Sequence, residues 1–321
     1  MLRDFPLRGP LRAAFAAAAP SAQAAAVPIR HAATVMLVRE GSVGPDRPLE
    51  VFTFRRVPSL AFAAGMLVFP GGAVDPRDAD PAVPWAGPPP STFRTALSAD
   101  EGLARAVVVA AVRETFEECG VLLAGRVGGE VLAESLADHP AWEQRRRALI
   151  DGELDLTTLL REAGLVLRAD LLRAWAHWLT PVGEPRRFDT RFFVAMLPAG
   201  QQARDLGGEG ERASWISPQQ ALARHLTDDL PMLPPTVVAL EELAAAGSLR
   251  RVIETPRSPR PVSPWIVEAG QEPDGAPRYV MRIDLDGLGG GEPRSCGDSG
   301  DGEAGSSGDG EAGSSGDGVH R

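Results

Sequence analysis

A segment with few helix breakers ends in residues 113–121, which read Arg113-Glu114-Thr115-Phe116-Glu117-Glu118-Cys119-Gly120-Val121. The residues before it, Ser98-Ala99-Asp100-Glu101, have the Ser-x-x-Glu form of a helix capping box. Glycine commonly stands just after the last turn of a helix. The pattern therefore predicts a helix that starts near Ala99 and stops at Gly120.

On this helix Glu114, Glu117 and Glu118 stand at positions i, i+3 and i+4, so their carboxylates share one face. Like charges so close repel, and a hard divalent cation that prefers oxygen ligands, Mg²⁺ or Mn²⁺, relieves the repulsion. Arg113 is placed to brace Glu117. The alternative is a solvent-exposed acidic helix face. A metal site is favoured because the apolar run 106–112 indicates a buried helix and a Gly-Gly loop ends a strand upstream.

Apolar and β-branched runs on both sides of the helix predict a sheet. These runs are residues 33–38, 49–55, 65–69, 174–180, 191–196 and 213–216. The third run ends in Pro70-Gly71-Gly72, and glycines let the backbone approach a ligand closely. Two further helices are expected, one from Ser217-Pro218 to Arg224 and one over 236–245.

Composition excludes several classes of protein. The chain has 321 residues and a formal net charge of -10, which argues against nucleic acid as a partner. No apolar run reaches the roughly 20 residues of a membrane span. The two cysteines, Cys119 and Cys296, have no paired spacing, so neither a disulfide scaffold nor a structural zinc site is expected.

Composition also predicts the organisation of the chain. The segments are a disordered Ala- and Arg-rich leader (1–28), a folded domain (29–255) with a surface insertion (73–97), a C-terminal extension (256–286) with one strand at 278–283, and a disordered tail (287–321). The tail repeats the acidic, Gly- and Ser-rich octapeptide SGDGEAGS. The final Val319-His320-Arg321 is not a Ser-Lys-Leu-type peroxisomal signal, so cytoplasmic localisation is expected.

The carboxylate helix resembles the Nudix box, whose pattern is G-x5-E-x7-R-E-U-x-E-E-x-G-U, with U an apolar residue. Gly72 and residues 113–121 fit this pattern, except that Thr115 stands at an apolar position. Residues 73–112 separate Gly72 from Arg113, which is about 27 residues more than the pattern allows. Counted back from Arg113, the first Glu of the pattern falls on Arg105.

A box split in this way, with Val68-Phe69-Pro70-Gly71-Gly72 ahead of the insertion, resembles the peroxisomal-type coenzyme A diphosphatase subgroup. Residues 178–181 (WLTP) and 186–193 (RRFDTRFF) are similar to the same subgroup. The resemblance covers roughly residues 31–253. It implies an α/β fold, the Nudix α/β/α sandwich with a mixed β-sheet between helices.

The coenzyme A signature of the superfamily, R-x3-G-x3-F-P-G-G, is partly present. Gly65 and Phe69 fit, whereas the arginine position holds Ala61. The resemblance implies metal-dependent hydrolysis of a phosphoanhydride bond in a small nucleoside-diphosphate-linked substrate, with coenzyme A or acyl-coenzyme A first among the candidates. The oligomeric state is left open.

The resemblance also implies roles for individual acids. Glu114, Glu117 and Glu118 would bind Mg²⁺ or Mn²⁺, and the catalytic base would be Glu114 or a glutamate from a later loop. Glu211 is the candidate for the later glutamate and Glu209 is its rival. The alternative for both is a loop acid without a catalytic role.

Substrate binding is expected from Gly71 and Gly72 and from Arg186, Arg187 and Arg191, because guanidinium groups match phosphate oxygens. The alternative for the arginines is an ion-paired strand edge around the intervening aspartate. Two other functions stay open. One is hydrolysis of a dinucleotide or nucleotide sugar. The other is a non-catalytic Nudix-like binding module, which the arginine in place of the first Glu favours and the three retained glutamates contradict.

Overall fold

The computed structural model describes residues 1–7, 27–41, 48–56, 65–133, 139–182, 184–206, 210–257, 259–271, 275 and 277–285. All of them belong to one unit that spans Met1–Leu288. The predicted repeat tail and most of the predicted leader lie outside the described residues. Among the described helices, none combines the length and apolar character needed to cross a membrane.

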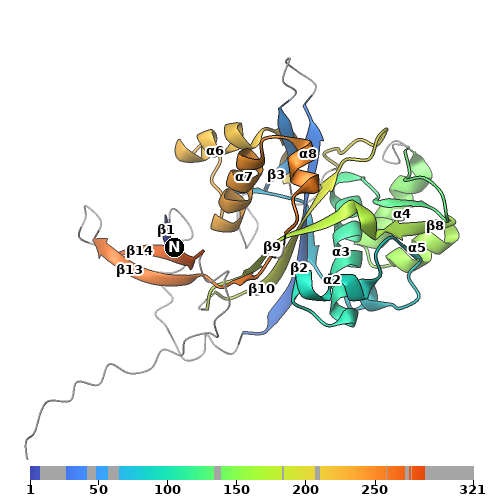
Figure 1. Ribbon diagram of the computed structural model, residues 1–321, viewed down its shortest axis with the longest axis horizontal. Coiled ribbons are helices and arrows are strands. Elements are labelled where there is room, and N and C mark those ends of the chain that lie inside the picture. The colour runs from blue at the N-terminus through green and yellow to red at the C-terminus, as the bar shows by residue number, and fades with distance from the viewer. Residues whose placement is uncertain are drawn as a thin grey trace, which may run out of the picture. The chain divides into compact units, whose positions relative to one another are not determined.

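A mixed sheet forms the centre of this unit (Figure 1). Its strands run in the order β11 (Gly210–Ile216), β3 (Leu49–Arg56), β2 (Ile29–Glu40), β10 (Arg187–Met196), β9 (Leu172–Leu179) and β12 (Pro261–Val262). Two short strands, β4 (Leu67–Val68) and β5 (Gly71–Ala73), pair with β3 and β2. The β2–β10 and β9–β12 pairs are parallel, whereas the other pairs in this sheet are antiparallel.

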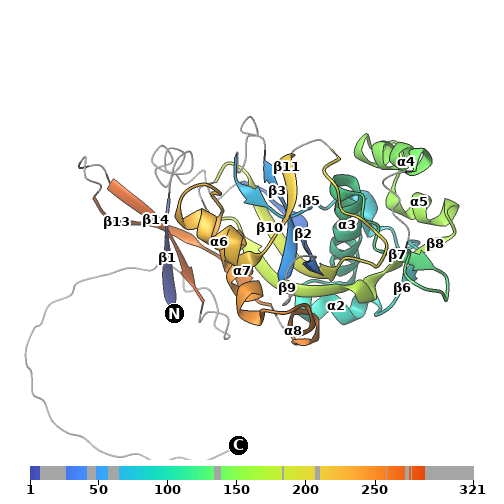
Figure 2. The ribbon, with the colours of Figure 1, turned by 90° about the horizontal axis from the view of Figure 1, so that it is seen from above.

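Helices cover both faces of the sheet. Figures 1 and 2 show α2 (Pro90–Leu97) and α3 (Glu101–Cys119) on one face, and α6 (Pro218–Leu226), α7 (Pro234–Ala246) and α8 (Leu249–Glu254) on the other. Alternate residues of β2 serve the two faces, as the period of a strand requires: Val35 and Leu37 pack in the core on the α3 side, Met36 and Val38 in the core on the α7 side. The predicted α/β/α sandwich with a mixed sheet is confirmed.

The start of α3 differs from the prediction. Asp100 caps the helix, since its side chain accepts a hydrogen bond from the Leu103 amide at 2.8 Å. Ser98 instead ends α2 in a left-handed conformation with φ 48°, so the predicted Ser98 capping box is wrong. The predicted end is confirmed: Gly120 has φ 72°, and its amide donates to the Phe116 carbonyl at 3.0 Å.

The insertion is only partly a surface segment. It contains the 3₁₀ helix η2 (Pro76–Ala79), β6 (Trp85–Ala86) and all of α2, and it buries Asp78, Val83, Phe93 and Leu97. Its strand β6 joins β8 (Leu165–Arg168) and β7 (Ala124–Arg126) in a second sheet, beside α4 (Pro140–Ile150) and α5 (Leu156–Glu162). The sequence did not reveal these buried residues, because the segment is Pro-rich and has no regular period. They pack against α3, which is distant in the chain.

A third sheet joins the two ends of the described chain. Its order is β1 (Leu2–Pro6), β14 (Pro277–Asp284) and β13 (Trp265–Gln271). The expectation of a disordered leader is wrong for residues 2–6, because they pair with β14 and bury Phe5 against the α7-side core. The predicted strand at 278–283 lies within β14. Met281 of this strand reaches the cavity described next.

Candidate active site

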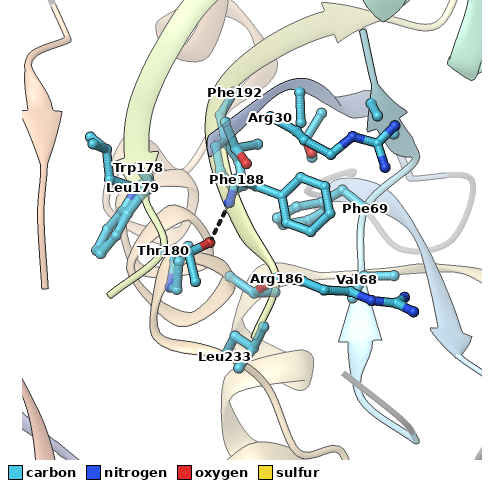
Figure 3. A pocket seen from close by; sticks show the side chains of 18 of the residues that line it. Arg30, Val68, Phe69, Trp178, Leu179, Thr180, Arg186, Phe188, Phe192 and Leu233 are labelled. Atoms are coloured by element: carbon cyan, nitrogen blue, oxygen red, sulfur yellow. Dashed lines mark hydrogen bonds between the residues drawn. The ribbon is translucent and has the colours of Figure 1, made fainter. Parts of the chain in front are cut away.

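A cavity of about 450 Å³ lies on the α7 side of the central sheet (Figure 3). Strand register defines its floor. Ala73, Ala32, Thr190 and Trp178 are consecutive partners across β5, β2, β10 and β9, and all four line the cavity. Three small side chains followed by an indole give a flat floor with a wall at the β9 end.

The carboxylates of the box reach this cavity beside Gly71 and Gly72. Glu118 Oε2 accepts a hydrogen bond from the Gly71 amide at 2.8 Å. A Cβ atom on Gly72 would lie 2.4 Å from Glu114 Oε1, so only glycine leaves room for that carboxylate. The structure therefore brings together the two predicted glycines and two of the three predicted metal ligands, and all four residues line the cavity.

One guanidinium group holds the carboxylates in place. Arg113 Nη1 donates to Glu114 Oε1 at 2.9 Å and lies 3.2 Å from both carboxylate oxygens of Glu117. Its Nε and Nη2 donate to the two carboxylate oxygens of Asp78, each at 3.0 Å. Arg113 and Asp78 expose only 11% and 3% of their side chains, so this pair is shielded from solvent. The predicted bracing of Glu117 by Arg113 is confirmed.

Asp78 corrects the assignment of the split box. Counted forward from Gly72, the five-residue gap of the Nudix pattern covers residues 73–77, so the acidic position falls on Asp78 and the extra residues come after it. The backward count had placed Arg105 at this position. Arg105 lies nine residues before Glu114, about 13 Å along the helix axis, and pairs with Glu101 at 3.6 Å. The box therefore keeps an acid at this position, and Arg105 does not line the cavity.

Burial dominates the titration of these acids. It raises the pKa of Glu114 to about 7, although the neighbouring Arg113 lowers it. Burial likewise raises the pKa of Glu117 and of Asp78, and in both cases Arg113 offsets part of the effect. A positive charge added at the cavity would favour the ionised form of Glu114.

The donor chemistry fits a hard divalent cation. Glu114 and Glu118 line the cavity with oxygen donors, whereas Glu117 does not line it. Within the described part of the chain, no group of three His, Cys, Asp or Glu side chains converges as a preformed metal cage. Mg²⁺ needs no such cage, because it usually keeps several waters and binds one or two carboxylates together with substrate phosphates. Glu117 as a third ligand stays a prediction.

The structure separates the three predicted arginines. Arg186 lines the cavity, but Arg187 and Arg191 do not. Arg187 donates to the Thr180 carbonyl at 3.3 Å. Arg191, with 2% of its side chain exposed, lies 2.7 Å from Asp189. The alternative prediction of an ion pair with the intervening aspartate therefore applies to Arg191, which lies on the sheet face opposite the cavity.

The same ion-paired group explains His177. It is 3% exposed and its Nε2 is hydrogen bonded to Asp189, so it is a buried structural residue. Cys119 is also buried, and its thiol lies 2.9 Å from the Thr115 carbonyl oxygen. Thr115, the polar residue at an apolar box position, donates its hydroxyl to the Ala111 carbonyl at 2.7 Å.

Several residues that line the cavity were missed in the sequence, among them the charged residues Arg30, Arg56 and Glu184. Arg30 lies at the start of β2, and Glu184 lies in the turn between β9 and β10. Glu184 is only 9% exposed, and desolvation raises its pKa. The sequence signal for Glu184 is its position between residues 178–181 and 186–193, both of which resemble the coenzyme A diphosphatase subgroup. Of the predicted later-loop acids, Glu211 falls in β11, with its side chain outside the description, and Glu209 lies outside the described residues.

Comparison with known proteins decides the family. A family model described as the NUDT19 Nudix domain matches residues 91–243. Acyl-coenzyme A diphosphatase NUDT19 of Gallus gallus is 30% identical over 262 residues, covering 68% of this chain and 69% of the relative. The protein of the same name from Homo sapiens is 31% identical over 267 residues, covering 68% and 70%. The chain belongs to the Nudix hydrolase family.

A solved structure agrees with this family assignment. The NUDIX hydrolase from Alicyclobacillus acidocaldarius superimposes with a TM-score of 0.59 and 29% identity, covering 72% of this chain and 98% of that one. The prediction of a Nudix hydrolase of the NUDT19-like subgroup, an enzyme that acts on diphosphate bonds, is confirmed. The family model begins after Gly72 and Asp78. Their part in this Nudix site is therefore seen in the contacts of the structure.

Proposed function

We propose that this Nudix hydrolase is a metal-dependent diphosphatase of coenzyme A or acyl-coenzyme A. One observation carries the proposal: a single cavity joins the box carboxylates to a largely apolar wall. The wall consists of Trp178, Leu233, Pro264 and Met281, from β9, the start of α7 and the C-terminal extension. Three strand spacings, about 14 Å, separate β5 beside the carboxylates from β9.

The shape of coenzyme A matches this division. Its diphosphate links a charged nucleotide to the pantetheine arm, which ends in a thiol or an acyl chain. With the diphosphate beside Gly71 and Gly72, the pantetheine arm would extend along the floor toward Trp178. Two curated relatives named acyl-coenzyme A diphosphatase support the same substrate class.

The proposed chemistry is positioning and charge neutralisation. Mg²⁺ or Mn²⁺, held by Glu114 and Glu118, would supply positive charge to the diphosphate oxygens. Arg113 fixes Glu114 through its 2.9 Å bond, and the Gly71 amide fixes Glu118. A water molecule that attacks phosphorus releases a proton. Glu114 is the box carboxylate proposed to accept it, and Glu211 of β11 is the alternative.

Water adds across the phosphoanhydride bond, so coenzyme A would give 3′,5′-ADP and 4′-phosphopantetheine. We would incubate the protein with coenzyme A or an acyl-coenzyme A, with and without Mg²⁺ or Mn²⁺, and quantify both products. We expect metal-stimulated release, which Glu114→Gln and the double variant Glu117→Gln, Glu118→Gln lose. Glu254→Gln is the matched control, because Glu254 is 61% exposed on α8 and, among the described residues, pairs with Arg250 alone.

Two experimental results would reject the proposal. Hydrolysis of dinucleotides or nucleotide sugars at rates equal to or above those for coenzyme A would reject the substrate. Tight ligand binding without hydrolysis of any member of the panel would reject turnover and establish a binding module.

A further inference from the structure

Two arginines at the cavity have no partner among the residues that the structure describes. Arg30 and Arg186 line the cavity and are exposed, and within the described residues neither forms a hydrogen bond or an ion pair. The third cavity arginine, Arg56, already has an interaction partner. Glu184, only two residues before Arg186, is not paired with it in the described part of the chain, since burial alone shifts its pKa. The Arg30 and Arg186 guanidinium groups are therefore available to a ligand.

The two arginines flank one aromatic ring. Arg30 is the register partner of Phe188 across the β2–β10 pair, and Arg186 precedes Phe188 by two residues. Figure 3 shows both guanidinium groups on the same side of the Phe188 ring, away from Trp178 and Leu179. Thr180 holds the Phe188 backbone from the other side, with its Oγ1 accepting from the Phe188 amide at 2.9 Å. The cavity thus has a cationic end opposite its apolar wall.

This cationic end is separate from the box carboxylates. Gly72 pairs with Ala33, three residues along β2 from Arg30. At the rise of a strand these three residues span roughly 10 Å. A diphosphate held beside Gly72 would therefore leave Arg30 and Arg186 facing a different part of the substrate.

We propose that Arg30 and Arg186 bind a phosphate monoester on the nucleotide half of the substrate, so that they select for this group. The inference rests on the proposed function, under which this group is the 3′-phosphate of coenzyme A. Guanidinium groups form strong, charge-assisted hydrogen bonds with phosphate oxygens. Neither arginine has an acidic partner in the described part of the chain, so the phosphate would displace no ion pair observed there.

The test compares coenzyme A with dephospho-coenzyme A, which lacks only the 3′-phosphate. We expect wild-type kcat/KM to favour coenzyme A, and each of Arg30→Ala and Arg186→Ala to lower kcat/KM for coenzyme A by about tenfold, chiefly through KM. The effect on dephospho-coenzyme A should stay within about twofold, since the deleted contact is absent there. Arg30→Lys should restore part of the preference. Arg94→Ala is the matched control, because Arg94 is an exposed arginine on α2 that does not line the cavity.

Equal losses on both substrates would overturn the inference while leaving the proposed function standing. If neither substrate is hydrolysed, the proposed function fails, and calorimetry with 3′,5′-ADP and 5′-AMP decides the inference by itself. Tighter binding of 3′,5′-ADP that disappears in the Arg30→Ala, Arg186→Ala double variant would support it. Equal affinities for the two nucleotides would refute it.

Discussion

Replacing Gly72 by alanine tests whether the contact between α3 and the glycine loop is required for catalysis. The new Cβ would lie 2.4 Å from Glu114 Oε1 and 2.5 Å from its Cδ, whereas ordinary contact begins at 3.4 Å. The carboxylate must therefore retreat by about 1 Å, and a displacement of that size can cost about 100-fold in rate. Gly72 is not among the positive-φ residues, so alanine suits its backbone.

The atoms in conflict belong to the end of a flexible side chain, so the fold should survive. We expect kcat/KM for the hydrolysed diphosphate to fall about 100-fold. The free energy of unfolding, from urea denaturation, should change by less than about 1 kcal/mol. Gly102→Ala is the matched control, because Gly102 lies on α3, the helix that carries Glu114, and its new Cβ would meet only Asp100 Oδ1, at 3.4 Å. This control should keep full activity.

A folded Gly72→Ala protein with kcat/KM within about threefold of wild type would refute the reasoning. If Gly72→Ala proves unstable, Glu114→Gln provides a second test, because this substitution keeps the shape of the side chain and removes its charge. If this variant also stays fully active, the carboxylate beside Gly72 has no part in the reaction.

Three further predictions concern stability and reactivity. Asp189→Asn leaves buried Arg191 without its counter-charge, so the free energy of unfolding should fall by about 3 kcal/mol at pH 7. Burial raises the pKa of Asp189, but the hydrogen bond with His177 and the charge of Arg191 outweigh this effect, so the pKa lies below its ordinary value. The difference in unfolding free energy between wild type and Asp189→Asn should therefore be lost below about pH 4 in acid titrations. Burial raises the pKa of Glu184, which means that the ionised carboxylate destabilises the folded protein. Glu184→Gln should therefore raise Tm at pH 8, and this gain should vanish below about pH 4, where the carboxyl group is protonated in the folded and the unfolded protein alike. Burial raises the pKa of Cys119 to about 12, so a Cys296→Ser protein should react with a thiol reagent at pH 8 only after unfolding.

The sequence alone determined the elements that depend on local pattern. The box helix, its stop at Gly120, the glycine loop and the main strands were predicted because periodicity and turn residues act over short distances. Helical spacing also predicted that the glutamates share a face. On a helix, however, Glu117 is rotated by about 60° from Glu114 in one direction and Glu118 by about 40° in the other. This rotation alone does not determine which of the three carboxylates face the cavity.

The tertiary structure decided which groups meet. Arg113 binds Glu114, Glu117 and Asp78, the last from 35 residues earlier in the chain, and Glu114 and Glu118 are the box carboxylates that line the cavity. Strand pairing likewise joins residues 2–6 to β14 and places Arg30 beside Phe188. No local pattern encodes these contacts, because each depends on two distant segments and on the competition of several side chains for one partner.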